Sequence, residues 1–207
     1  FLVIEGAGGS MKIQSMSFVG GSTTDGVAIN FVASATDGDG DVTQMPFEVT
    51  FAGGSGGNYI LTGGSGSDNM LGGTGNDILV GGAGDDTLTA GLGNDTFKWM
   101  SGDEGTSTTP AVDIVTDFNN GNDVLNLADL LQGESHVGTD PGNLASYLHF
   151  TYDSATNSTV VNVTSTGSGG ADQKIVLSGV GDLTSGGAVA DNQIIANLLN
   201  QAKLITG

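Results

Sequence analysis

A nine-residue pattern of glycine, polar and apolar positions repeats through the middle of the chain. In each copy the second and fourth positions are glycine, the sixth is Asp or Asn, and the eighth is a large apolar residue. The five copies are GGSGGNYIL (53–61), GGSGSDNML (63–71), GGTGNDILV (72–80), GGAGDDTLT (81–89) and AGLGNDTFK (90–98). In this alignment only Thr62 breaks the spacing. The pattern predicts a turn followed by one short strand in every copy.

The glycines explain the turn, and the apolar position explains the strand. Glycine adopts positive φ and lets two backbones approach closely, so GGxGx favours a tight turn whose carbonyl groups converge. A strand this short cannot bury enough apolar surface alone, so the copies must stack around a shared core. A flexible glycine-rich linker would not keep its apolar residues in register. The predicted core positions are Ile60, Met70, Leu79, Leu88 and Phe97.

Apolar stretches before the repeats predict further β-strands. MKIQSMSF (11–18), VAINFVA (27–33) and FEVTF (47–51) are separated by turn-forming glycine, serine and aspartate. We therefore divide the chain into a β-rich segment at 1–52, the repeat array at 53–98, and a third region at 99–207.

The third region mixes strands with short helices. We expect strands at 113–118 and 123–127, a short helix LADLL before Gly133, a helical turn capped by Asn143, a hairpin of 149–153 with 158–164, and a strand at 173–179. A final helix is expected from Asp191 as its N-cap. Its apolar face comprises Ile194, Ile195, Leu198, Leu199 and Ala202. Three aromatic residues at the ends of the array are candidate caps for the open roll, with ligand stacking as the alternative: Tyr59, Phe97 and Trp99.

The charge balance excludes several partners. There are 23 acidic residues against four lysines, and the net charge is −19. Without a basic patch the chain cannot neutralise phosphates, so nucleic acid and anionic membranes are poor partners. Carboxylates in such excess repel one another in a compact state, and bound divalent cations would relieve that repulsion.

The absence of cysteine, the length of the apolar stretches and the N-terminal residues further narrow the kind of protein this chain can be. The chain has no cysteine, which excludes disulfides and thiolate metal sites. No apolar stretch is long enough to cross a membrane, so we expect no membrane insertion. The N-terminus lacks the features of a secretory signal peptide and begins within a pattern, which suggests a piece of a longer protein.

The repeats resemble the calcium-binding nonapeptide GGxGxDxUx of RTX proteins. In that family two consecutive copies form one coil of a parallel β-roll, and ions lie between the turns of copies n and n+2. The resemblance implies one row with turns 53–58, 72–77 and 90–95, and another with turns 63–68 and 81–86. The predicted fold is therefore all-β: a calcium-bound parallel β-roll between an N-terminal β segment with an immunoglobulin-like flavour and a C-terminal β-rich region with short helices.

The same resemblance implies a set of calcium ligands. The sixth-position carboxylates would be Asp77 and Asp95 in one row, and Asp68 and Asp86 in the other. Asn58 stands at the sixth position of the first copy, so its site should be weaker or completed differently. The turns would add backbone oxygens at Gly54, Gly56, Gly64, Gly66, Gly73, Gly75, Gly82, Gly84, Gly91 and Gly93.

Segments after the repeats resemble the C-terminal end of large RTX adhesins exported by type I secretion. The resemblance is carried by the repeats with FKWMSGDEG (97–105), DIVTDFNNGNDVLNLADLL (113–131) and the apolar helix at 194–204, and it covers about 53–207. ATDGDGDVTQMPFEVTF (35–51) looks like the end of an immunoglobulin-like adhesin repeat.

The resemblance implies a calcium-folded targeting module of a secreted or cell-surface adhesin. An uncleaved C-terminal signal would be recognised by the ABC transporter of a three-part export channel, and the chain would travel unfolded. Extracellular calcium modules have Kd values of roughly 10⁻⁴–10⁻³ M, far above cytosolic calcium, so folding would wait for the outside. We expect the isolated module to be a monomer.

Further carboxylates outside the repeats are candidate calcium ligands. Asp37, Asp39 and Asp41 alternate with glycine and could wrap one cation, although the rest of an EF-hand loop is missing; a solvated acidic turn is the alternative. Asp113, Asp117 and Asp123 either bind calcium beyond the roll, as the resembling family implies, or lie at the surface. Asp103 and Glu104 are interpreted as loop residues.

The sequence offers little support for catalysis. His136 and His149 form no HExxH pattern, and no G-x-S-x-G elbow is present, so we do not expect an enzyme. Two alternatives stay open. One is a ligand- or ice-binding roll, suggested by Thr74 and Asn76, although the equivalent positions vary between copies. The other is the C-terminal domain of an RTX toxin or enzyme.

Overall fold

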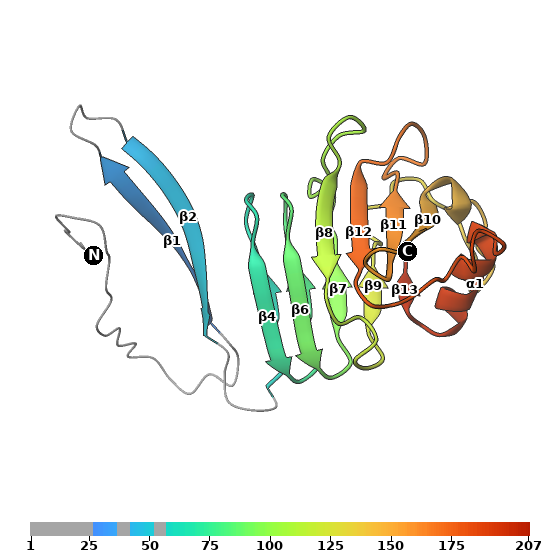
Figure 1. Cartoon of the computed structure of the whole chain (residues 1–207), viewed down its shortest axis with the longest axis horizontal. Helices are drawn as coiled ribbons and strands as arrows, with labels where there is room; N and C mark the ends of the chain where they lie inside the picture. Colours follow the sequence, from blue (N-terminus) through green and yellow to red (C-terminus); the bar gives the residue numbers. More distant parts are fainter. Residues whose placement is uncertain (1–26, 37–41, 52–56) are drawn as a thin grey trace.

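The computed structural model describes residues 27–36, 42–51 and 57–207 (Figure 1). Strand β1 (Val27–Thr36) pairs antiparallel with β2 (Val42–Phe51), with Val27 opposite Phe51. These are the strands predicted around 27–33 and 47–51. The strand predicted at 11–18 lies outside the described residues.

The repeats fold into two columns of parallel strands. Alternate copies contribute β3 (Ile60–Thr62), β5 (Ile78–Val80) and β7 (Thr96–Lys98) to one sheet, and β4 (Asn69–Thr74) and β6 (Thr87–Leu92) to the other. Each strand pairs in parallel with the strand two copies away, as in Ile60 opposite Ile78 and Ile78 opposite Thr96. Two copies therefore make one coil, which confirms the parallel β-roll expected from the sequence.

The register of the first copy differs from the sequence alignment by one residue. Leu61 pairs with Leu79 and is 1% exposed, whereas Ile60 is 71% exposed. Both residues are apolar, so the pattern alone placed the wrong one at the eighth position. The first unit is 54–62, Tyr59 occupies its sixth position, and Thr62 is an ordinary ninth residue.

Both sheets continue beyond the repeats in the described part of the chain (Figure 1). The five-stranded sheet has the order β13-β9-β7-β5-β3, and the six-stranded sheet the order β10-β11-β12-β8-β6-β4. The added strands are β8 (Ala111–Val115), β9 (Val124–Asn126), β10 (Leu148–Asp153), β11 (Ser158–Val163), β12 (Gln173–Leu177) and β13 (Leu204–Ile205). The hairpin predicted at 149–164 is formed by β10 and β11.

One apolar core fills the space between the sheets. It includes Leu79, Leu88 and Phe97 from the repeats and continues through Leu125 and Ile175 of the following strands. Tyr59, Phe97 and Trp99, the candidate caps, are all buried in it. The repeat array and the C-terminal region therefore share a core.

The short helices differ in part from prediction. Helix α1 (Asp191–Asn200) forms, but it ends before Ala202, which has φ of +53°. Asp191 is not the N-cap; that position is Ala190, because the Asp191 carboxylate instead accepts the amide of Phe150 at 3.0 Å. LADLL forms a single turn rather than a helix.

A 3₁₀ turn, η1 (Leu144–Ser146), follows Asn143 as predicted. The Asn143 side chain does not cap it, because its Oδ1 accepts the amide of Ser135 at 2.7 Å. Local capping preference is overridden here, as at Asp191, by a contact with a more distant segment.

A matched pair in β6 tests the core. Leu88→Ala removes a fully buried side chain and should lower the free energy of unfolding by about 2–5 kcal/mol. Leu92→Ala, in the same strand but 58% exposed, should change it by less than about 0.5 kcal/mol. Denaturant unfolding in one buffer measures both, and equal effects would contradict the assignment of the inner face.

Candidate metal centre

Aspartates at the ends of the turns stack into a ladder along one edge of the roll. The Tyr59 amide donates to Oδ1 of Asp77 at 2.7 Å, and the Asp77 amide donates to Oδ1 of Asp95 at 2.7 Å. The Asp95 amide continues the series to Oδ1 of Asp123 at 3.0 Å. We call Asp77, Asp95 and Asp123 the Asp77 row.

A second ladder runs along the other edge. The Asp68 amide donates to Oδ1 of Asp86 at 2.9 Å, and the Asp86 amide donates to Oδ1 of Asp113 at 2.9 Å. We call Asp68, Asp86 and Asp113 the Asp86 row. The two rows group the repeat aspartates as the sequence predicted, and each row gains a member from beyond the repeats.

Three of these carboxylates have an oxygen without a hydrogen-bond partner. Oδ2 of Asp77, Asp86 and Asp95 is buried and unpartnered, and each residue is 1% exposed. Leaving a buried charged oxygen unsatisfied is costly, so such atoms are normally paired or bound to a metal. The turns therefore contain buried acceptor oxygens of the kind that a bound cation satisfies.

Burial and mutual repulsion disfavour the charged form of these groups. Burial raises the pKa of Asp77 and Asp95, and it raises the pKa of Asp86 and Asp123 to about 6. Neighbouring carboxylates raise it further at Asp86, where Asp113 and Asp68 contribute. A divalent cation would reverse both effects by favouring the ionised form.

The turn glycines leave room only for backbone and carboxylate oxygens. A Cβ on Gly72 would collide with Oδ2 of Asp77 and with the carbonyl oxygen of Ala90 in the next coil. A Cβ on Gly93 would meet the carbonyl oxygen of Gly75, and Gly93 itself has φ of +150°. Carbonyl and carboxylate oxygens therefore lie close together where the coils stack.

Gly75, Gly82, Gly84 and Gly91 also face a carbonyl oxygen of the neighbouring coil, whereas a Cβ on Gly66 or Gly73 would meet nothing within 4 Å. Six of the predicted turn glycines have φ between +89° and +150°: Gly73, Gly75, Gly82, Gly84, Gly91 and Gly93. The carbonyl oxygens of Gly64 and Gly66 face Gly82 and Gly84 of the next coil. Gly54 and Gly56 lie outside the described residues.

The donor set fits calcium. Within the described residues no three His, Cys, Asp or Glu side chains come together as a metal-binding group. A site here must draw most of its ligands from backbone carbonyls, with carboxylates added. Calcium takes six to eight oxygens of this mixed kind, whereas zinc prefers nitrogen and sulfur in closed tetrahedral sites.

Asn58 does not stand in the place of a sixth-position aspartate, contrary to the sequence alignment. Its Oδ1 accepts the amide of Asn76 at 2.7 Å, Asn76 accepts from Asn94 at 2.9 Å, and Asn94 accepts from Asn122 at 3.1 Å. These four form an exposed asparagine ladder at the fifth position. Tyr59 holds the carboxylate position, because the first unit begins one residue later.

A further turn of the roll was missed by the sequence reasoning. Gly121, Asn122 and Asp123 stack on Gly93, Asn94 and Asp95, and β9 pairs with β7 through Phe97 opposite Leu125. The signal was GNDVLN (121–126), which shares the GND turn and an apolar fifth residue with GNDTFK (93–98). An intervening loop disguises the repeat.

Asp117 lies beside this added turn. Its two oxygens accept the amides of Ala90 and Gly91 at 3.1 and 2.7 Å, and its charge raises the pKa of both Asp95 and Asp123. Lys203 counteracts part of this repulsion, because its charge lowers the pKa of Asp123. Asp117 and Asp123 are thus gathered at the end of the Asp77 row, whereas Asp37, Asp39 and Asp41 lie outside the described residues.

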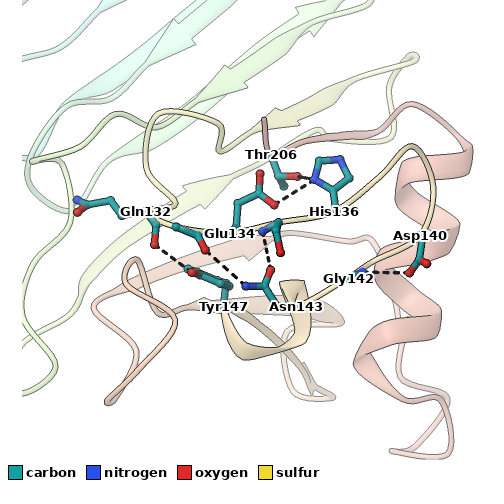
Figure 2. Close-up of polar contacts among 10 residues, drawn as sticks. Gln132, Glu134, His136, Asp140, Gly142, Asn143, Tyr147 and Thr206 are labelled. Atoms are coloured by element: carbon teal, nitrogen blue, oxygen red, sulfur yellow. Dashed lines mark hydrogen bonds and ion pairs between the residues drawn. The ribbon is translucent and has the colours of Figure 1, made fainter.

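The histidines belong to different polar clusters. His136 is half-buried, and its Nδ1 lies 3.0 Å from Oε2 of Glu134 and 3.2 Å from Oγ1 of Thr206, next to β13 (Figure 2). Tyr147 donates to the Gln132 carbonyl at 3.0 Å in the same region. These contacts fasten the loop after β9 to the C-terminal strand.

His149 is exposed on β10, and its Nδ1 lies 2.6 Å from Oδ2 of Asp191. This contact joins β10 to the start of α1. Neither histidine lies in the two aspartate rows.

A comparison with protein-family models shows which family the chain belongs to. Residues 34–189 match the model of the peptidase M10 serralysin C-terminal family. The chain belongs to this family. Its members are RTX-type calcium-binding β-roll domains, which are non-catalytic C-terminal modules of the proteins that contain them. No curated protein matches the chain.

Two solved structures are similar at low identity. The AlgE6R3 subunit of the mannuronan C5-epimerase of Azotobacter vinelandii is 23% identical over 66% of this chain and 76% of that one, with a TM-score of 0.43. The AlgE6R2 subunit of that enzyme is 24% identical over 64% of this chain and 89% of that one, with a TM-score of 0.38. Separately, no helix in the described residues is long and apolar enough to cross a membrane.

The raised pKa values predict an acid-stabilised fold in calcium-free buffer. Asp86 and Asp123 have folded-state pKa values of about 6 against an ordinary value of 3.8, so the folded state binds protons that the unfolded state does not. The free energy of unfolding should therefore rise as the pH falls from about 7 to about 5. Far-UV circular dichroism in EDTA, which reports the folded fraction at each pH, measures this trend.

Asp86→Asn should weaken the pH dependence of the free energy of unfolding in calcium-free buffer. Asp129→Asn, which changes an exposed carboxylate beside Lys98, should leave that dependence unchanged. A calcium-free fold that loses stability over the same acid range would contradict the burial of these charges.

Proposed function

We propose that calcium is the ligand that folds this module. The observation that supports it is the set of buried, unpartnered Oδ2 atoms on Asp77, Asp86 and Asp95, at turns lined with carbonyl oxygens. Calcium bound there would supply the missing positive charge between successive coils. Membership of a calcium-binding family supports the same conclusion.

The ligands would be divided between the two rows. In the Asp77 row we assign calcium to Asp77, Asp95 and Asp123, with Asp117 beside the last site. In the Asp86 row we assign it to Asp68 and Asp86. The turn glycines would contribute carbonyl oxygens, and Asp37, Asp39 and Asp41 stay a separate candidate site.

Weak sites suffice for a folding switch. An ion that binds only the folded state contributes about 1.4 kcal/mol at a concentration of tenfold its Kd. Several such sites together approach the net stability of a domain, about 5–15 kcal/mol. A chain without arginine and with a net charge of −19 has correspondingly strong self-repulsion to overcome.

We further propose that the switch serves export. Serralysin C-terminal domains belong to secreted proteins. A chain that stays loose at cytosolic calcium and folds at about millimolar calcium can be threaded through a type I export channel and then trapped outside. Its partner would be the ABC transporter of that channel, recognising the C-terminal region, and its location would be secreted or at the bacterial surface.

We propose that the module is part of a larger protein at the cell surface. The segments at 97–105 and 113–131 favour a large adhesin that acts in biofilm formation or in attachment to a host or surface. The competing assignment is the C-terminal module of a secreted enzyme or toxin, which the family match also accommodates. A ligand- or ice-binding roll is favoured by the exposed asparagine ladder, but Leu92, two residues before Asn94, is an apolar side chain with 58% exposure in the same copy.

A charge-matched pair of double variants tests the calcium sites. Asp77→Ala with Asp95→Ala removes two neighbouring rungs of one row, so calcium affinity and the unfolding temperature in calcium should both fall. Asp129→Ala with Asp140→Ala removes the same charge from exposed positions and should leave both unchanged. Calorimetric titration and thermal unfolding make the comparison. Undiminished calcium binding by the first pair would refute the assignment.

The export role predicts retention of a truncated chain. Ending the protein before Asp191 removes α1 and β13, and should leave it inside cells that carry the matching export system. Leu88→Ala damages the core but keeps the C-terminal region, so it should still be exported, since export uses the unfolded chain. Immunoblots of cells and medium distinguish the two, and normal secretion of the truncation would rule out the signal.

A further inference from the structure

Asp113 continues the Asp86 row but differs from its neighbours in one oxygen. Like Asp86, which accepts the Asp68 amide, it accepts the preceding coil's amide through Oδ1, here from Asp86 at 2.9 Å. Its Oδ2, however, accepts the Trp99 indole N–H at 2.6 Å and the Gln173 side-chain N–H at 2.8 Å. In Asp86 the corresponding Oδ2 is buried and unpartnered.

The three residues come from separate elements. Asp113 lies in β8, Gln173 in the neighbouring strand β12, and Trp99 directly after β7. All three are 1% exposed or less, so water does not compete for the carboxylate. Gln173 opposes Ala111 in the parallel β12–β8 pairing, which brings its amide to this end of β8.

The geometry points to Asp113 as the terminator of the Asp86 row rather than as a calcium ligand. The inference rests on the proposed calcium sites and says where one row of them stops. Burial raises the pKa of Asp113 to about 6, and the two N–H dipoles directed at Oδ2 oppose that rise by favouring the ionised carboxylate. Their positive ends occupy the side from which a cation would approach.

The arrangement also links the last ion site to the C-terminal strands. Asp113 holds the Asp86 amide with one oxygen, and holds Trp99 and Gln173 with the other. An ion bound at Asp86 fixes the turn whose amide Asp113 accepts. Trp99 and Gln173 are therefore positioning residues that join the ion-bound coil to β12.

The number of bound calcium ions distinguishes the two carboxylates. Wild-type protein, Asp86→Asn and Asp113→Asn are dialysed against millimolar calcium and counted by atomic absorption. Asp86→Asn should lose calcium relative to wild type. Asp113→Asn should keep the wild-type number while its unfolding temperature in calcium falls, because the amide nitrogen cannot accept from Trp99 and Gln173.

A second variant covers the case in which Asp113→Asn does not fold. Gln173→Met removes one donor without touching the carboxylate, and it should keep the full calcium number with a lower unfolding temperature. Loss of an ion from Asp113→Asn or Gln173→Met would overturn the inference, since Asp113, or the unpartnered Oε1 of Gln173, would then be a ligand. A wild-type protein that binds no calcium would instead refute the proposed function itself.

Discussion

The stacking of aspartates on the backbone of the preceding coil is the constraint on which the rest of the structure depends. Five of these carboxylates accept the amide of the sixth-position residue of the preceding coil, which holds successive coils in register: Asp77, Asp86, Asp95, Asp113 and Asp123. The same contacts line up like charges at the spacing of neighbouring strands, about 4.8 Å. Within the described residues, no lysine or histidine forms an ion pair with either row.

This constraint sets the apolar side and the polar side of each unit against one another. The apolar side of each unit favours stacking because Leu79, Leu88 and Phe97 are completely buried. The polar side opposes stacking because burial and repulsion disfavour the charged aspartates. Each coil therefore adds apolar contacts that stabilise the roll and aspartates whose burial and repulsion destabilise it. A divalent ion changes the balance without any change in the apolar contacts.

The ends of the two rows show how the protein limits the repeating pattern. The Asp77 row gains a turn at 121–123. The positive charge of Lys203 lowers the pKa of Asp123, the last carboxylate of this row. The Asp86 row ends at Asp113 among neutral donors. From these points the sheets continue through β12 and β13 without further carboxylates in the rows. The repeating roll thus passes into an ordinary apolar core.

The sequence predicted the parts of the fold that repeat, because glycine, aspartate and apolar positions recur with one period. It misassigned the first copy, since Ile60 and Leu61 are equally apolar and only pairing with β5 separates them. Asp191 and Asn143 were predicted as helix caps from local preference, and each is instead used by a distant segment. The contact of Asp113 with Gln173 joins residues 60 positions apart, beyond the reach of any local pattern.

The most direct test of the account is far-UV circular dichroism of the EDTA-stripped chain, titrated with calcium and separately with magnesium at neutral pH. The account predicts a cooperative gain of β signal with calcium at about millimolar or below. Magnesium should not reproduce it, because that ion demands a tighter octahedral shell and releases water reluctantly. A chain already fully folded in EDTA would contradict the account, because the apolar core alone would then overcome the repulsion of the aspartate rows.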